Sequence, residues 1–296
     1  MPVNPAASPV IAAFRALRRA LDDTESEDER VLLRNALRDA LDRDAATMAE
    51  TRIVANSWTV TGEIHRGRHF VIEALRHRDL GDSWAIKRII SAHARDPLFR
   101  DMLLREAANH LRVRHKAVLA AHAVLRLEDG SPGLVLEYRQ GPSLAAQLSQ
   151  SALTAVQILQ LTSRICEALI EVHSLGIIHG DVTPANILLP QGEPGLALLC
   201  DFGLSTVAGA GIDGFDALGT PGFMAPEAEI PCAPRHPAAD IYGLGAIITA
   251  CLDVAGTDCC VPLHQLAALL CAQDVASRPQ TVATVQHRLK TIASEL

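Results

Sequence analysis

Residues 179–186 are His-Gly-Asp-Val-Thr-Pro-Ala-Asn (HGDVTPAN), and this stretch decides the fold prediction. Asp-Phe-Gly follows at 201–203, and Ala-Pro-Glu at 225–227 comes directly after GTPGFM. Upstream, Trp-Ala-Ile-Lys at 84–87 ends in one of only three lysines in the chain. Each motif alone is weak evidence, because acids and amides in loops are often simple turn formers. Their order along one chain is the stronger observation.

The segments around these motifs change from strand-like to helical periodicity along the chain. Turn signals such as Gly81-Asp82 separate the short apolar runs of the first half. The pattern predicts strands at 58–61, 70–75, 83–90 and 133–138, helices at 96–113 and 154–175, and, after two short strands and a glycine-rich loop at 203–222, helices to the end. Strands first and helices later predict an α+β protein in two lobes.

In this order the four motifs resemble the signature set of the protein kinase family. The resemblance runs from about Trp58 to the C-terminus. It implies a two-lobed protein-kinase-like fold, with a small β-rich N-lobe at 53–139 and a larger helical C-lobe at 140–296. Residues 1–52 form a predicted helical N-terminal extension, either a hairpin packed on the next domain or an arm for self-association or partner binding.

The resemblance assigns catalytic roles to three residues. Asp181 is expected to accept a proton from the substrate hydroxyl, or at least to orient it. Lys87 is expected to hold the ATP phosphates and to be fixed by Glu106, which lies 19 residues later on the predicted helix. Asn186 and Asp201 are expected to ligate Mg²⁺, since hard oxygen donors suit this ion.

The nucleotide pocket follows from the same resemblance. Leu136, Glu137 and Tyr138 form the expected hinge, and Cys200 is expected to line the pocket. The glycine-rich loop is poor, because His65 and Phe70 occupy two of its three glycine positions. The implied ATP-binding residues are Ile64, Gly67, Ile72, Ala85, Lys87, Glu137, Tyr138, Leu188 and Asp201.

Two further departures lie in the catalytic loop. Gly180 stands where kinases switched by activation-loop phosphorylation carry an arginine that receives the phosphate. We therefore expect activity without such a phosphate; Ser205, Thr206 and Thr220 are the only hydroxyl residues between Asp-Phe-Gly and Ala-Pro-Glu. Thr183 replaces a lysine that touches the γ-phosphate, which removes a charge from the transition state.

A second stretch, His77-Arg78-Asp79-Leu80, matches the family's catalytic motif literally. Trp84 stands five residues after Asp79, where the family has asparagine, so we assign this stretch to a hairpin turn.

Three C-lobe residues have structural roles by resemblance. Glu227 and Arg278 match a buried ion pair, and Asp240 matches an aspartate that anchors the catalytic loop. The pair is 51 residues apart, which is short for the family and predicts a reduced substrate-docking region.

These observations favour a serine/threonine protein kinase of the bacterial eukaryotic-like group, which transfers the γ-phosphoryl group of Mg·ATP to protein hydroxyls. The substrate loop GTPGFMAPE favours protein substrates. One alternative is a pseudokinase or scaffold that binds a partner through residues 1–52. The other is a small-molecule phosphotransferase, because HGDVTPAN partly resembles the loop of aminoglycoside kinases.

Composition excludes some classes of protein. With 27 basic and 34 acidic residues, the net charge of −7 does not suggest nucleic-acid binding. The chain has neither a signal-peptide pattern nor about 18 uninterrupted apolar residues, so we expect a cytoplasmic protein that does not contact a membrane. Seven cysteines are an odd number, and Cys259, Cys260 and His264 lack further ligands for a zinc site.

Overall fold

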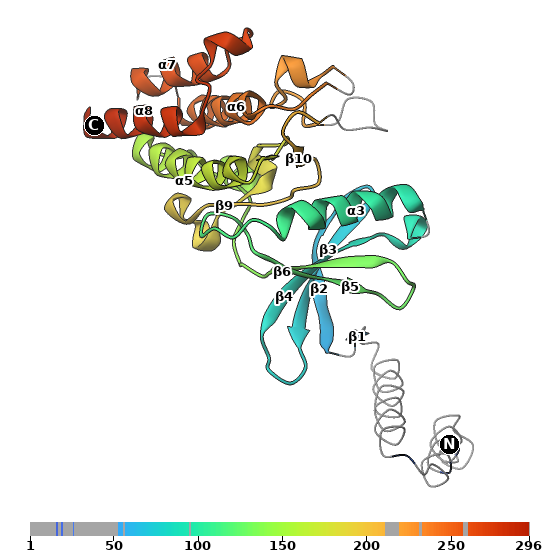
Figure 1. Cartoon of the computed structure of the whole chain (residues 1–296). Helices are drawn as coiled ribbons and strands as arrows, with labels where there is room; N and C mark the ends of the chain where they lie inside the picture. Colours follow the sequence, from blue (N-terminus) through green and yellow to red (C-terminus); the bar gives the residue numbers. More distant parts are fainter. Residues whose placement is uncertain are drawn as a thin grey trace.

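The computed structural model describes residues 53–55, 57–94, 96–210, 219–230, 233–256 and 260–295, with three isolated positions before them. The predicted helical extension at 1–52 therefore lies outside the described residues, apart from Ala16, Arg19 and Ser26. Figure 1 shows two lobes, one built on a sheet crossed by a single helix and one made mainly of helices. This is the predicted α+β architecture.

The N-lobe contains a six-stranded antiparallel sheet with the order β1-β2-β3-β4-β6-β5. Its central strand β4 pairs Lys87 with Ile72 on one side and with Leu134 on the other. The strands are β1 (Ile53–Val54), β2 (Trp58–Arg66), β3 (Phe70–His77), β4 (Ser83–Ile89), β5 (Ala121–Arg126) and β6 (Pro132–Glu137).

Two strands differ from the prediction. β2 continues past Thr61 to Arg66, because its pairing with β3 resumes after two register shifts. β5 was missed, since its six residues alternate between partly buried and exposed and include a histidine and an arginine. Its place at the sheet edge beside β6 explains why only one face needs apolar side chains.

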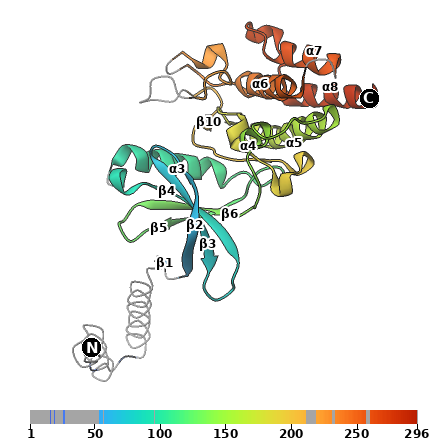
Figure 2. The ribbon, with the colours of Figure 1, turned by 180° about the vertical axis from the view of Figure 1, so that it is seen from behind.

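Helix α3 (Pro97–His110) crosses this sheet, as both views of the ribbon show (Figures 1 and 2). The Asp96 side chain accepts a hydrogen bond from the Leu98 amide, and Pro97 occupies the first helical position, so the helix begins with two favourable capping features. Its buried residues Phe99 and Leu103 pack with β4 and β6 in one apolar cluster.

The C-lobe is built around helix α5 (Ala155–Ser174), which begins with a capping box formed by Thr154 and Gln157. Its other helices are α4 (Leu144–Leu148), α6 (Pro237–Ala255), α7 (Val261–Leu270) and α8 (Val282–Glu295). Its short strands are β7 (Ile177–Ile178), β8 (Ile187–Leu188), β9 (Leu198–Leu199) and β10 (Thr206–Val207).

Helix α6 is long and apolar enough to cross a membrane by length and composition, and 56% of its most apolar stretch is buried inside the fold. Ile241, Leu244 and Ile248 are fully buried in the C-lobe core, and Asp240 in the first turn is buried too. Packing with α5 and α7 therefore accounts for the apolar character of α6. Only residues 256–260 separate α6 from α7.

The literal His-Arg-Asp-Leu stretch forms the predicted hairpin turn. His77 ends β3, and its Nδ1 accepts hydrogen bonds of 3.2 Å from the amides of Asp79 and Leu80. Leu80 is 72% exposed.

The predicted ion pair between Glu227 and Arg278 is present. Arg278 donates to Glu227 Oε1 at 2.7 Å and to Oε2 at 2.9 Å, in the bidentate geometry typical of strong pairs. The guanidinium also donates to the carbonyls of Ala238 and Ala272 and lies over the Tyr242 ring. It therefore joins the end of the substrate loop to α6 and to the segment before α8.

We expect Arg278→Ala to lower the free energy of unfolding by about 3 kcal/mol, because it leaves a partly buried carboxylate and several carbonyls without a donor. Urea unfolding monitored by circular dichroism measures this loss. Arg288→Ala, at an exposed position on α8, is the matched control and is expected to change stability by less than about 0.5 kcal/mol. Equal effects of the two substitutions would contradict the role of Arg278.

Candidate active site

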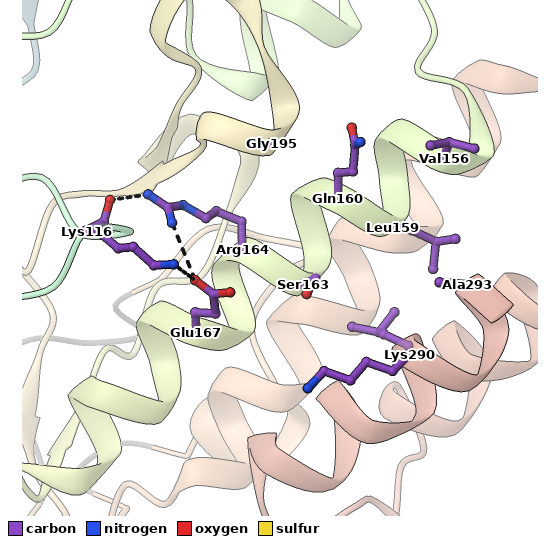
Figure 3. Close-up of a pocket in the computed structure, with 11 residues that line it drawn as sticks. Lys116, Val156, Leu159, Gln160, Ser163, Arg164, Glu167, Gly195, Lys290 and Ala293 are labelled. Atoms are coloured by element: carbon purple, nitrogen blue, oxygen red, sulfur yellow. Dashed lines mark hydrogen bonds and ion pairs between the residues drawn. The ribbon is translucent and has the colours of Figure 1, made fainter.

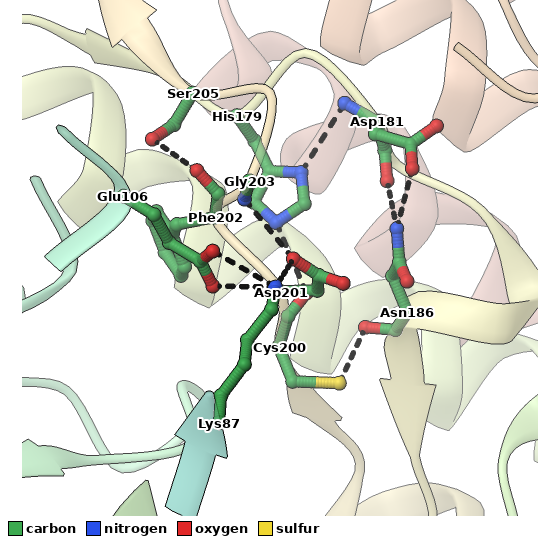
Figure 4. Close-up of polar contacts among 10 residues, drawn as sticks. All are labelled: Lys87, Glu106, His179, Asp181, Asn186, Cys200, Asp201, Phe202, Gly203 and Ser205. Carbon is green, nitrogen blue, oxygen red and sulfur yellow. Dashed lines mark hydrogen bonds and ion pairs between the residues drawn. The ribbon is translucent and has the colours of Figure 1, made fainter. Parts of the chain in front are cut away.

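Lys87, Glu106 and Asp201 meet in the cleft between the lobes (Figure 4). Lys87 Nζ lies 2.8 Å from Glu106 Oε1 and 2.7 Å from Asp201 Oδ1. Lys87 is 5% exposed and Glu106 is 2% exposed, so neither charge is well hydrated. Because β4, α3 and the segment after β9 each contribute one residue, the cluster also joins the two lobes.

The charges in this cluster support one another. Burial alone would lower the pKa of the Lys87 ammonium, but the nearby carboxylates of Asp201 and Glu106 outweigh burial and raise it. Burial raises the pKa of Glu106, against the opposing effect of Lys87. For Asp201 the ammonium outweighs burial and lowers the pKa to about 2. The lysine therefore stays charged, as a phosphate-binding group must.

Asp181 is held on both sides of its carboxylate. Asn186 Nδ2 donates to Asp181 Oδ2 at 2.7 Å, and the Thr220 hydroxyl donates to Oδ1 at 3.1 Å. The Thr220 amide also donates to Oδ1 at 3.3 Å. The substrate loop and the catalytic loop therefore meet at the residue predicted to be catalytic.

Asp240 anchors the catalytic loop, as the resemblance implied. Its Oδ2 accepts from the His179 amide at 2.9 Å, and its Oδ1 accepts from the Gly180 amide at 2.8 Å. His173 Nε2 lies 2.8 Å from Oδ2. These hydrogen bonds outweigh the effect of burial and lower the pKa of Asp240.

Glycine is required at position 180 for a geometric reason. Gly180 has φ of +80°, and a Cβ atom there would lie 2.7 Å from the Leu204 carbonyl oxygen. Thr183, three residues later, is 1% exposed, and its hydroxyl makes no hydrogen bond. A buried hydroxyl at this position replaces the lysine that the family directs at the γ-phosphate.

A cleft of about 460 Å³ lies beside the Lys87 cluster. It contains the predicted Cys200 and Leu136 of the hinge. Of the predicted ATP-binding residues, Gly67 is not part of its wall, because it lies at the turn of the β2–β3 hairpin. The predicted residues that do line it are Ile64, Ile72, Ala85, Lys87, Glu137, Tyr138, Leu188 and Asp201.

The hairpin turn packs on helix α3 through aromatic rings. His69 stacks on Phe99 with ring centroids 4.4 Å apart, and Phe70 meets Phe99 edge-on at 6.2 Å. Lys87 Nζ lies 5.4 Å from the centre of the Phe70 ring. Phe70, which replaces one family glycine, and its neighbour His69 therefore connect this hairpin to α3.

The sequence analysis missed His110 and Asn109. His110 stacks on Phe202 at 4.4 Å, and its Nε2 lies 2.7 Å from the Leu119 carbonyl. Asn109 donates to the Ser205 hydroxyl at 3.0 Å. Asn109 and His110 follow Glu106 by three and four residues, so helical periodicity places them beside Glu106. This spacing could have predicted their position near the site. They connect α3 to the Asp-Phe-Gly segment.

The hydroxyl-bearing residues after Asp-Phe-Gly are either buried or hydrogen-bonded. Ser205 is 2% exposed and donates to the Phe202 carbonyl at 2.7 Å. Thr206 is 7% exposed, and Thr220 is bonded to Asp181. In this conformation none of the three presents a free, exposed hydroxyl.

Cys200 lies at the base of the cleft. Its Sγ donates to the Asn186 carbonyl at 3.1 Å, and burial raises its pKa to about 12. Among the described residues no cluster of three or more metal-ligating side chains occurs, and Cys260 is a free thiol. Cys259 lies outside the described residues.

A second groove of about 580 Å³ lies between α5 and α8 (Figure 3). Lys116 and Arg164 both pair there with Glu167, at 3.2 Å and 3.4 Å. None of the predicted catalytic residues lines it, so we place the active site in the interlobe cleft.

Comparison with known proteins agrees with this geometry. The family model described as the protein kinase domain matches residues 58–256. Similar chains include a probable serine/threonine-protein kinase PknB of Corynebacterium glutamicum, 28% identical over 67% of this chain and 31% of the relative. Serine/threonine-protein kinase PkaA of Streptomyces coelicolor is 33% identical over 57% of this chain and 31% of the relative. The chain thus spans about a third of these curated relatives.

Among solved structures, the PknI kinase domain of Mycobacterium tuberculosis shares the fold, with a TM-score of 0.61 and 20% sequence identity. The alignment covers 83% of this chain and 98% of that one. The chain belongs to the protein kinase family, and the predicted two-lobed kinase fold is confirmed.

We expect Gly180→Ala to destabilise the protein more than Gly176→Ala. Both glycines have positive φ, which costs alanine about 1 kcal/mol, but only at Gly180 would the new Cβ meet a backbone oxygen. The contact should add about 1–2 kcal/mol. Chemical unfolding of the two variants measures the difference, and equal losses would exclude the close approach.

We expect His110 to make stability depend on pH. Burial lowers its pKa from 6.5 to about 4, so the unfolded chain binds a proton between these values that the folded chain does not. The free energy of unfolding should therefore fall as the pH drops from 6.5 to 4, by up to about 1.4 kcal/mol per pH unit from this group.

Urea unfolding at several pH values tests this dependence. His110→Leu should flatten the profile between pH 6.5 and 4, whereas His287→Gln, at an exposed position on α8, should leave it unchanged. Parallel profiles for the wild type and His110→Leu would assign the dependence to other groups.

Proposed function

We propose that this chain transfers the γ-phosphoryl group of ATP to serine or threonine hydroxyls of proteins, and that it needs no activation-loop phosphate. The observation that carries the proposal is the contact of Lys87 with both Glu106 and Asp201, at 2.8 Å and 2.7 Å. A scaffold has no need of this arrangement beside a restrained Asp181.

The residues of the cleft have distinct roles in this reaction. Lys87 binds and orients the phosphates, and Glu106 fixes its position. Asp181 orients the attacking hydroxyl and accepts its proton, while the oxygen forms a bond to the γ-phosphorus and the bond to the β-phosphate oxygen breaks. Thr220 and Asn186 hold the Asp181 carboxylate in place for this transfer.

The donor atoms present fit Mg²⁺. Asn186 uses its Nδ2 for Asp181, and Asp201 uses Oδ1 for Lys87 and the Gly203 amide. No hydrogen bond among the described residues takes up Asn186 Oδ1 or Asp201 Oδ2, which leaves two hard oxygens for the ion. Asn186 and Asp201 would hold the ion, which would supply positive charge against the phosphates.

Independence from an activation-loop phosphate is supported by three observations. Gly180 provides no cation to receive it, and the Lys87 contacts are complete without it. The hydroxyls of Ser205 and Thr206 are also buried.

Protein substrates are supported by the Thr220 loop and its ion pair with Arg278, and by the names of the relatives. We further propose a cytoplasmic location, in keeping with the free thiols among the described cysteines.

We expect Asp181→Asn to lower phosphoryl transfer at least about 100-fold, because the neutral amide does not accept the hydroxyl proton. The purified chain is incubated with Mg²⁺ and γ-labelled ATP, with a generic basic protein as acceptor, and phosphoamino acids are identified. Asp79→Asn is the matched control, since Asp79 lies in the exposed turn between β3 and β4, and it should keep wild-type activity.

Label on serine or threonine that disappears only in Asp181→Asn would support the proposal. Wild-type activity in Asp181→Asn would overturn the catalytic assignment. Binding of Mg·ATP without transfer to any protein would instead favour a pseudokinase.

A further inference from the structure

Arg235 is a buried cation without a partner in the part of the chain that the structure describes. The residue is 7% exposed, and its Nε and Nη1 atoms are buried without a hydrogen bond. Burial of an unpaired charge is costly, so such a group requires an explanation.

Two acidic groups among the described residues influence Arg235, and both already have partners. Glu227 and Asp240 are the carboxylates whose charge reaches its guanidinium. Both oxygens of Glu227 bind Arg278, and both oxygens of Asp240 accept from the catalytic loop or from His173. Burial consequently lowers the pKa of Arg235 despite these two acids.

The backbone places Arg235 at a junction of functional segments. Its amide donates to the Ala210 carbonyl at 3.1 Å, and its carbonyl accepts from the Gly209 amide at 2.9 Å. His236, the next residue, is the N-cap of the 19-residue helix α6 and provides no side-chain cap. Helix α6 therefore begins two residues after Arg235, and its dipole is positive at this end.

We propose that Arg235 and the N-terminal end of α6 form a binding site for a tetrahedral oxyanion, either free phosphate or the phosphate of a phosphorylated residue on a bound protein. A guanidinium and the positive end of a helix dipole both recur in phosphate recognition. In α6, Pro237 has no amide hydrogen and the Ala239 amide donates to the His236 carbonyl, so the guanidinium is the main donor of this site. The chain's own Ser205, Thr206 and Thr220 do not supply this phosphate, because their hydroxyls are buried or bound to Asp181.

Binding at this site acts on the catalytic loop through α6. The first turn of α6 carries Asp240, which holds the amides of His179 and Gly180. An anion that neutralises Arg235 stabilises this end of the helix. Position 180 lacks the arginine that phosphate-switched relatives use, and Arg235 supplies a cation from a different element of the same lobe.

Thermal unfolding of the full chain tests the site without ATP, so its outcome is independent of catalysis. The wild type is compared in phosphate and in chloride at equal ionic strength. Phosphate at ten times its dissociation constant should raise the Tm by about 3 °C. Arg235→Met should abolish this rise, and Arg105→Met, at an exposed position on α3, should retain it.

In chloride, Arg235→Met should be at least as stable as the wild type, because it removes an uncompensated buried charge. Arg235→Gln, which keeps a polar end, guards against a packing effect of methionine and should also lose the response to phosphate. An equal response to phosphate in the wild type and both variants would overturn the proposal. A large loss of Tm for both variants in chloride would do so too, because it would show that Arg235 is compensated within the chain.

The source of the oxyanion is distinguished by a phosphothreonine peptide and its unphosphorylated form. A rise in Tm with the phosphopeptide at concentrations where inorganic phosphate has no effect would assign the site to a phosphorylated protein. If the phosphopeptide and inorganic phosphate raise the Tm at the same concentrations, the site would be assigned to free phosphate. Arg235→Met should lose either response.

Discussion

Lys87 contacts Glu106 and Asp201 at the same time, and this shared contact joins the two lobes. The ammonium is almost inaccessible to water, so the two carboxylates must remain in place for the charge to be tolerated. Because they come from α3 and from the segment after β9, this requirement fixes how the sheet, the helix and the C-lobe meet. Two further contacts join α3 to the C-lobe, namely the packing of His110 on Phe202 and the hydrogen bond between Asn109 and Ser205.

Inside the C-lobe, Asp240 is the buried charge that holds the catalytic loop in place. An apolar helix is an unusual place for a buried carboxylate, yet three donors satisfy it, two of them catalytic-loop amides. The loop that carries Asp181 is therefore attached to a helix buried in the core of the lobe. Positioning of this kind is what a reaction dominated by orientation and charge stabilisation needs.

Much of this arrangement was predictable, because the motifs combine rare residue types with fixed spacing. One lysine of three, and a glutamate 19 residues later on a helical pattern, were enough to predict the Lys87–Glu106 pair. The sequence did not reveal β5, whose edge position relaxes the apolar pattern, or the absence of Gly67 from the cleft wall. The sequence also could not predict that the Arg235 guanidinium has no hydrogen-bond partner among the described residues, because this depends on which partners the neighbouring acids already have.

The environment of Cys200 in the cleft wall has a consequence for covalent chemistry there. Burial raises the pKa of the Cys200 thiol to about 12, so the reactive thiolate is scarce at neutral pH. An electrophile attached to a nucleotide-like scaffold would thus reach a sulfur that is protonated and donating to the Asn186 carbonyl. Ligands of this cleft would be held by shape complementarity and hydrogen bonding. Their residence time would be set by the dissociation rate and not by a covalent bond to Cys200.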